Sequence, residues 1–157
     1  MQFHRLPGHS IRRLHQISVQ VFQLHMREAG LDLTPVQFAA LDAIAANPGI
    51  DQARVAALIA YDRATIGGVI DRLVQKGLVE RIVSGRDRRA RELSLSDAGR
   101  SVHAAALPVV ISCQDTILAR LSTEEREQFL RLARKAAGGS DEADPEAAAP
   151  AELRDRK

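Results

Sequence analysis

The chain has 157 residues, of which 45% are hydrophobic and only 3% aromatic. This length and apolar content suffice for one domain with a real core, which excludes a disordered chain, and the scarcity of aromatic residues favours packed helices over a β-sandwich or barrel. The net charge of +2 averages unlike regions, because residues 81–91 carry five arginines and one acid, whereas residues 138–157 hold six acids and three bases.

The cysteine content and the hydropathy of the chain indicate the cellular compartment in which it is expected. The single cysteine, Cys113, excludes an intrachain disulfide framework and a thiolate zinc cluster. The N-terminus lacks the apolar segment of a signal peptide, and the longest apolar stretch, residues 104–111, is far shorter than the ~20 residues of a membrane span. We expect a cytoplasmic protein without a membrane segment.

Two helices are predicted before residue 48. The first runs from Ser10, its expected N-cap, to Ala29, with apolar residues at helical spacing. The second begins with Thr34 as N-cap and Pro35 in the first turn, and it ends at Asn47. Each presents one apolar face.

Two further helices follow, separated by a turn at residues 60–61. Asp51 begins a short third helix, and Asp62 caps a longer fourth helix that ends at Gly77. After Gly77 the apolar period changes from 3.6 to 2, and residues 78–83 and 91–95 read as two strands of a hairpin whose tip, residues 84–89, is charged.

The run from Ser96 to Leu121 predicts a helix that is apolar on more than one face, with Pro108 kinking it rather than ending it. One small domain cannot cover all of that apolar surface, so a second copy of the chain is the simplest solution. Ser122 with Glu125 forms a capping-box pattern for a last helix that ends before the glycines at 138–139.

These elements define the predicted fold class, which is mainly α with a small β-hairpin wing: a winged helix-turn-helix with a helical dimerisation region. Residues 138–157, rich in Ala, Asp, Glu and Pro without apolar periodicity, are predicted to form a disordered acidic tail.

The fourth helix occupies the place of a recognition helix, whose N-terminal half enters the major groove. Arg63 can reach guanine or a phosphate there, Thr65 can contact a base edge or a thymine methyl, and Ala64 leaves room for approach. Gly67 and Gly68 are unusual, since each costs roughly 1 kcal/mol against alanine inside a helix. Close backbone approach and a locally loose helix explain them equally well.

The hairpin tip predicts a second contact with DNA. Four arginines, Arg86, Arg88, Arg89 and Arg91, lie where a wing follows the backbone and the minor groove, and Asp87 can orient one of them through a bidentate pair. A solvated charged loop is the alternative, but the position directly after a helix-turn-helix favours DNA.

The chain resembles the MarR (multiple-antibiotic-resistance regulator) family. The similar segments are residues 62–66, 69–73, 76–81 and 87–99, including Arg72 and the wing sequence around Asp87. The resemblance implies a homodimer that reads a pseudo-palindromic operator, with residues 1–32 as an N-terminal dimerisation helix, residues 33–96 as the DNA-binding region and residues 97–137 as the C-terminal dimerisation helices. It also places Arg63 and Thr65 at recognition-helix positions. Gly68 departs from the bulkier polar residues often found in the family, and we place it with Arg72 in the expected DNA-contacting set.

The family's usual effector, a small aromatic acid, implies a pocket beside the first helix. His15, Ser18, Phe22 and His25 form one stripe of that helix, with Arg13 nearby. A ring could stack on Phe22 while a histidine or the arginine holds a carboxylate. The alternative is that these are ordinary interface or surface residues.

Three other functions can be compared with the sequence: a zinc-responsive regulator, an enzyme and a module that contacts only proteins. Four of the five histidines lie in the first 25 residues, which raises a zinc-responsive regulator of the same fold, although their spacing forms no tight metal-binding pair. We predict no catalytic residues, cofactor or metal site, because the sequence holds no phosphate loop, nucleophile elbow or acid/base pair. A winged-helix module that contacts only proteins is the third alternative.

Overall fold

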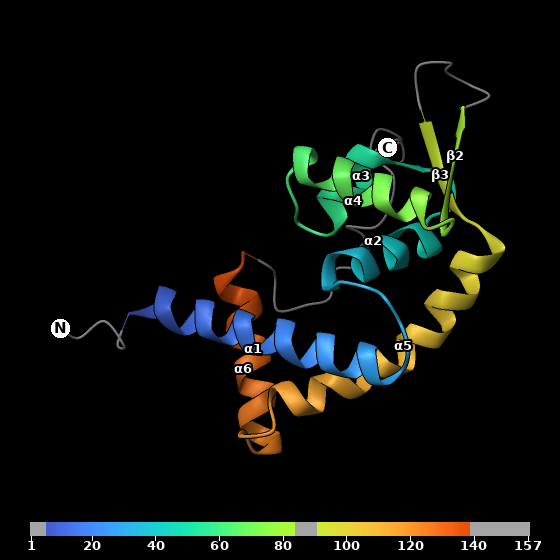
Figure 1. The fold of residues 1–157 in the computed structure, drawn as a ribbon. Coiled ribbons are helices and arrows are strands. Elements are labelled where there is room, and N and C mark those ends of the chain that lie inside the picture. The colour runs from blue at the N-terminus through green and yellow to red at the C-terminus, as the bar shows by residue number, and fades with distance from the viewer. Residues whose placement is uncertain (1–5, 84–90, 139–157) are drawn as a thin grey trace, which may run out of the picture. The chain divides into compact units, whose positions relative to one another are not determined.

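The computed structural model describes residues 6–83 and 91–138, and the chain divides into two compact units after Ile117. The first unit holds α1 (Pro7–Glu28), α2 (Pro35–Ala46), β1 (Ile50–Asp51), α3 (Gln52–Leu58), α4 (Arg63–Gln75), β2 (Val79–Val83), β3 (Arg91–Leu95) and α5 (Asp97–Ile117), and the second holds α6 (Thr123–Ala136) (Figure 1). This is the predicted fold class, mainly helical with a small antiparallel sheet.

The first helix begins earlier than predicted. Its N-cap is Leu6 and Pro7 occupies the first helical position, so the assignment of Ser10 as N-cap was wrong. Proline suits that position because its fixed φ is helical and its missing N–H would have no intrahelical partner. The start of α2 agrees with prediction, because the Thr34 side chain accepts from Gln37 N and the Gln37 side chain accepts from Thr34 N.

Aspartates cap the next two helices, as predicted. Asp51 accepts from Arg54 N at 2.9 Å and begins α3, and Asp62 accepts from Thr65 N at 2.8 Å and begins α4. Gly77, with φ of 70°, ends α4 in a left-handed conformation that glycine adopts without steric cost. The chain then enters β2 directly.

The sheet has three strands in the order β1-β3-β2, all antiparallel. β2 and β3 form the predicted hairpin, in which Val83 pairs with Arg91 and Val79 pairs with Leu95. The two-residue strand β1 was not predicted, because two residues cannot display a period. Ile50 pairs with Leu93 and is buried there, so β1 attaches the start of α3 to the hairpin.

The core of the first unit is continuous from α1 to α5. Leu41 and Ile44 of α2, together with Ile66, Ile70 and Leu73 of α4, are completely buried. Phe22 and Met26 of α1 and Ala106 of α5 join the same cluster. The helix-turn-helix therefore packs on the same core as the long helices.

A close backbone approach joins α5 to the end of α4. The Ser96 hydroxyl donates to the Gly77 carbonyl oxygen at 2.6 Å and accepts from Gly99 N at 2.9 Å. Gly99 is buried, and a Cβ there would lie closer than 3.0 Å to the Leu78 carbonyl oxygen. Only a residue without a side chain fits at this crossing.

α5 continues through Pro108, as predicted, and α6 of the second unit carries the predicted capping box between Ser122 and Glu125. Large apolar side chains nevertheless remain at the surface of the described chain. They include Ile11, Leu14 and Leu24 of α1, Leu107 and Ile111 of α5, and Leu130 and Leu132 of α6.

Gly99→Ala should destabilise the protein by on the order of 2 kcal/mol, because the added methyl group forces backbone apart at the α5–β2 crossing. Chemical denaturation followed by circular dichroism, at one fixed protein concentration, measures this. Gly68→Ala is the matched control: a Cβ there has no atom within 4 Å, so alanine should stabilise α4 by about 1 kcal/mol. Equal stability of the two variants would contradict the close approach.

Candidate nucleic-acid interface

The turn between α3 and α4 fixes the angle at which the predicted recognition helix leaves the fold. Ala60 adopts φ of 53°, a left-handed conformation that non-glycine residues rarely adopt, and Tyr61 N donates to the Ala56 carbonyl oxygen at 2.9 Å. This backbone bond closes the turn at residues 60–61 that the sequence predicted.

Asp62 makes two hydrogen bonds with one residue of α4. Its Oδ1 accepts from Thr65 N at 2.8 Å, and its Oδ2 accepts from Thr65 Oγ1 at 2.5 Å. The side-chain bond and then the backbone bond from Thr65 hold the pKa of the Asp62 carboxyl below its ordinary value, so the group is a carboxylate at neutral pH. The cap thus carries a full negative charge.

α4 separates its buried and exposed residues by helical period. Ile66, Val69, Ile70 and Leu73 are buried against the core. The five residues of α4 that we placed at the DNA are all exposed: Arg63, Ala64, Thr65, Gly68 and Arg72. All five residues are accessible from solvent, with Arg63 at the beginning of α4 and Arg72 near its end, and their contact with DNA stays a prediction.

The position of α4 is fixed by two ion pairs, neither of which the sequence predicted. Arg81 Nη2 of β2 lies 2.6 Å from Asp71 Oδ1, which links α4 to the hairpin. Lys76 Nζ lies 2.7 Å from Asp32 Oδ2 and donates to the Asp32 carbonyl oxygen, which ties the end of α4 to the segment before α2. Sequence spacing carries no signal for such long-range pairs.

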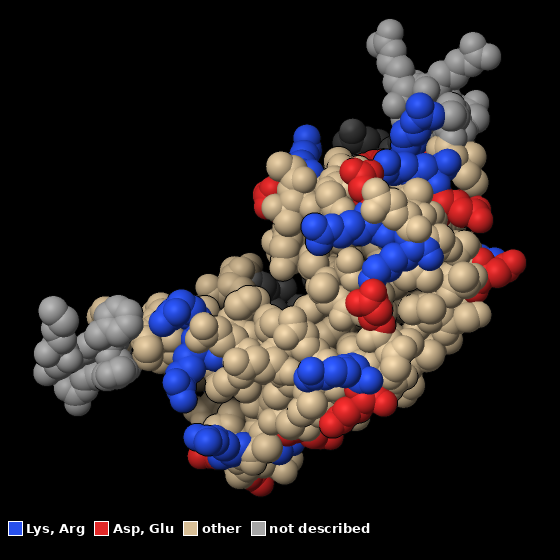
Figure 2. All heavy atoms as spheres, in the orientation of Figure 1, with Lys and Arg blue, Asp and Glu red and all other residues tan. Residues whose placement is uncertain are grey.

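Only one of the predicted wing residues lies within the described part of the chain. Arg91 begins β3 and is exposed, whereas Arg86, Asp87, Arg88 and Arg89 lie outside the described residues. Figure 2 shows Lys and Arg side chains gathered over the part of the molecule that carries α4 and the hairpin strands, with Asp and Glu side chains among them. The surface is basic but of mixed sign.

The predicted effector stripe of α1 is only partly buried. Arg13 and His15 are exposed, Ser18 and His25 are half-buried, and Phe22 is buried. The Phe22 ring lies 6.4 Å from the ring of Phe38 in α2. An aromatic group therefore does lie at the base of the stripe, while the charged end faces solvent.

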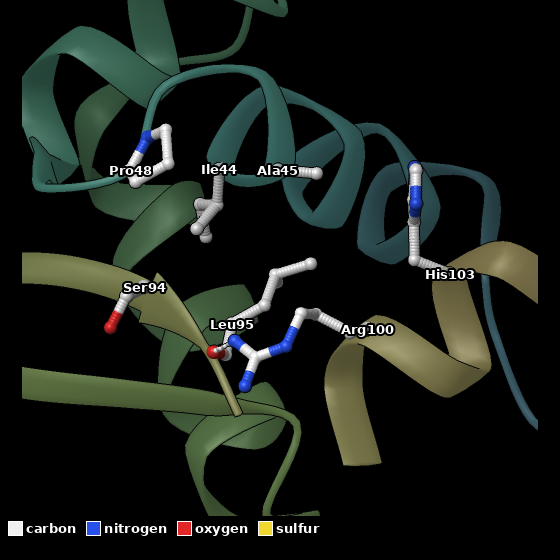
Figure 3. A pocket seen from close by; sticks show the side chains of 7 residues that line it. All are labelled: Ile44, Ala45, Pro48, Ser94, Leu95, Arg100 and His103. Carbon is white, nitrogen blue, oxygen red and sulfur yellow. Dashed lines mark hydrogen bonds between the residues drawn. The ribbon is translucent and has the colours of Figure 1, made fainter. Parts of the chain in front are cut away.

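The described chain also has a cavity of about 270 Å³ between α2, β3 and α5, which the sequence did not predict. In Figure 3, Arg100 and His103 of α5 and Leu95 of β3 lie across this space from Ile44, Ala45 and Pro48. None of the five residues of the α1 stripe lines it.

Two polar side chains of that cavity, His103 and Arg100, already have partners. His103 Nε2 lies 2.8 Å from Asp42 Oδ1, and the His103 ring stacks on Phe38 at 5.7 Å. Arg100 Nη1 donates to the Leu95 carbonyl oxygen at 2.7 Å, and Nη2 pairs with Asp97. The only sequence signal was that His103 is the one histidine outside the N-terminal 25 residues.

Three observations on the described residues concern metal binding, membrane-spanning helices and the reactivity of the cysteine. Within residues 6–83 and 91–138, no group of three His, Cys, Asp or Glu side chains could hold a metal ion. No helix of that same part is long and apolar enough to cross a membrane. Cys113 is buried, and desolvation raises the pKa of its thiol, which disfavours the reactive thiolate.

Known proteins share this architecture and sequence. The MarR-family model matches residues 31–90. The transcriptional regulator HosA of Escherichia coli is 37% identical over 127 residues, which are 79% of this chain and 93% of HosA.

Two solved structures are similar over most of the chain. BpsR of Bordetella bronchiseptica, whose DNA binding is regulated by 6-hydroxynicotinic acid, has a TM-score of 0.80 and 28% identity, covering 88% of this chain and 97% of BpsR. The repressor CouR bound to a 23-mer DNA duplex has a TM-score of 0.78 and 28% identity, covering 87% and 95%.

HosA is a transcriptional regulator, CouR is a transcriptional repressor and BpsR binds DNA, which confirms the class of DNA-binding transcriptional regulator that the sequence predicted. The similarity to HosA extends over nearly the whole of that regulator and over most of this chain. The chain therefore belongs to the MarR family of winged helix-turn-helix transcriptional regulators.

Proposed function

We propose that this regulator is a repressor that binds a pseudo-palindromic operator as a homodimer and is released by a small aromatic or heteroaromatic carboxylate. The observation that carries the proposal is the exposed face of α4, which presents Arg63 and Thr65 to solvent at the beginning of the helix. Such a protein acts on chromosomal DNA, so we place it in the cytoplasm.

The chemistry of the α4 surface supports DNA as the partner. Arg63 is a fixed positive charge at the first helical position, and Arg72 adds a second charge about two and a half turns later. The relative CouR has been solved on a DNA duplex. A module that contacts only proteins has no need for an arginine in the N-terminal half of this helix, the half that enters the groove.

Uncovered apolar side chains support a homodimer. Ile11 and Leu24 of α1 and Ile111 of α5 are 67%, 45% and 63% exposed in a single chain. Burying such side chains is worth about 1.5–3 kcal/mol each, so a second copy that covers them gains substantial stability. We accordingly assign residues 1–32 and 97–137 to dimerisation and residues 33–96 to DNA binding, while residues 139–157 of the predicted tail lie outside the described residues.

Two half-sites read by a two-fold dimer lie about 34 Å apart. A ligand that prefers a conformer with wrongly spaced recognition helices weakens DNA binding by its differential affinity, on the order of 1–3 kcal/mol. For an aromatic acid at the α1 stripe, Phe22 offers a ring, and a histidine of the stripe or Arg13 offers a partner for the carboxylate. The regulation of BpsR by 6-hydroxynicotinic acid supports this effector class.

Arg63→Ala should weaken binding to the specific operator by about tenfold or more and relax its base preference, because a bidentate arginine–guanine contact is worth about 1–3 kcal/mol. Fluorescence anisotropy with a duplex from the protein's own upstream region, and with a scrambled duplex, measures both effects. Arg12→Ala, an exposed arginine of α1, is the matched control and should bind like the original protein. Unchanged discrimination in Arg63→Ala would refute this assignment.

Arg89→Ala should lower affinity for the operator and for the scrambled duplex alike, and reduce the slope of log K against log salt by about 1, since it removes one phosphate contact. The same titrations at several salt concentrations test this, with Arg12→Ala again as control. A slope equal to that of the control would place the wing away from DNA.

One acid from a panel of aromatic and heteroaromatic carboxylates should release the operator, and Arg13→Ala should require a higher concentration of that acid while binding DNA normally without it. His103→Ala is the comparison variant. Loss of the response in His103→Ala alone would move the effector site to the cavity of Figure 3. A response to zinc, and to no acid, would favour the metal-sensing alternative.

A further inference from the structure

In the structure, the hydroxyl of Thr65 donates a hydrogen bond to the carboxylate of Asp62. We propose that Asp62 fixes Thr65 as a hydrogen-bond acceptor, and that Thr65 thereby selects a base pair whose adenine N6 or cytosine N4 amino group faces it in the major groove. This inference rests on the proposed DNA-reading role of α4 and names the chemistry that one of its residues recognises.

The first step is a count of hydrogens. A threonine hydroxyl has one hydrogen to donate and two lone pairs that accept. Asp62 is ionised at neutral pH and so can only accept, and it receives both the Thr65 N–H and the Thr65 hydroxyl, at 2.8 and 2.5 Å. The one hydroxyl hydrogen is therefore committed inside the cap, and Thr65 offers DNA only lone pairs and a methyl group.

The second step is access. Thr65 and Asp62 are both exposed, and Thr65 is the third residue of α4, in the half of the helix that enters the groove. Its neighbours do not obstruct it, because Ala64 has only a methyl group and Gly68, one turn later, has open space where a side chain would be. A base edge can reach the Thr65 oxygen.

The third step is the pattern of the bases. In the major groove, adenine N6 and cytosine N4 donate, whereas guanine N7 and O6 and thymine O4 accept. A lone-pair surface attracts the first two and repels the others. The carboxylate of Asp62 is an acceptor as well and strengthens the same preference. Arg63, which can only donate, has the opposite preference on the adjacent position.

Three variants distinguish the proposed acceptor role of the Thr65 hydroxyl from a purely structural role of Asp62 and Thr65. Thr65→Val keeps the shape and a methyl group and removes the lone pairs. Asp62→Asn keeps the cap, since asparagine caps helices about as well as aspartate. The asparagine amide can also donate to Thr65 Oγ1, which frees the hydroxyl hydrogen to meet an acceptor base. Asp51→Asn makes the same change at the matched cap of α3, where Asp51 accepts from Arg54 N and contacts no hydroxyl.

The experiment is selection of bound duplexes from a library with a randomised operator, followed by competition titrations with single-base changes. For the unmodified protein we expect one position in each half-site to prefer adenine or cytosine over guanine or thymine by about fivefold or more. Thr65→Val should lose that preference, and Asp62→Asn should broaden it toward guanine or thymine, while every other position keeps its preference. Asp51→Asn should select the same sequences as the unmodified protein.

Two results overturn the inference. If Thr65→Val and Asp62→Asn weaken all sequences equally, Asp62 and Thr65 only stabilise the helix. If Thr65→Val keeps the base preference and Thr65→Ser loses it, the methyl group reads thymine and the hydroxyl does not. A protein that selects no sequence at all would instead overturn the proposed DNA-reading function, which is a distinguishable failure.

Discussion

The burial of one face of α4 is the constraint on which the rest of the molecule depends. Ile66, Ile70 and Leu73 are completely buried, and each such side chain contributes about 1.5–3 kcal/mol. A helix whose buried positions are fixed has its exposed positions fixed too, since both follow the same 3.6-residue period. The outward placement of Arg63 and Thr65 is thus a consequence of hydrophobic packing on the opposite face.

A helix cap and two ion pairs restrict the orientation of α4 relative to its neighbours. Its beginning is fixed by the Asp62 cap, its middle by the pair of Asp71 with Arg81, and its end by the pair of Lys76 with Asp32. Exposed ion pairs of this kind add little stability, with a median near 0–1 kcal/mol. Their effect is to orient the helix, because one ion pair connects α4 to the hairpin and the other connects it to the segment before α2. The Asp62 cap does the same at the turn before α4.

Local chemistry was predictable from the sequence, and long-range contact was not. The caps at Thr34, Asp51, Asp62 and Ser122 agree with prediction because an N-cap depends only on residues within one turn. Strand β1, the ion pair of Arg81 and the cavity beside His103 depend on residues distant in sequence, and no periodicity reports them. The start of α1 was misplaced because a proline, and not a hydroxyl side chain, begins it.

On the proposed DNA-reading role of α4, the carboxylate that caps this helix lowers affinity for DNA. The charge of Asp62 repels nearby phosphates, and this repulsion is the same kind of penalty for specific and for non-specific duplexes. Arg63, next to it, supplies a charge of opposite sign that can engage guanine at a matching site. Under that proposal, the ratio between specific and non-specific affinity comes from Arg63 and Thr65, because only a matching sequence engages both side chains, and this ratio is the quantity that a regulator facing a whole chromosome requires.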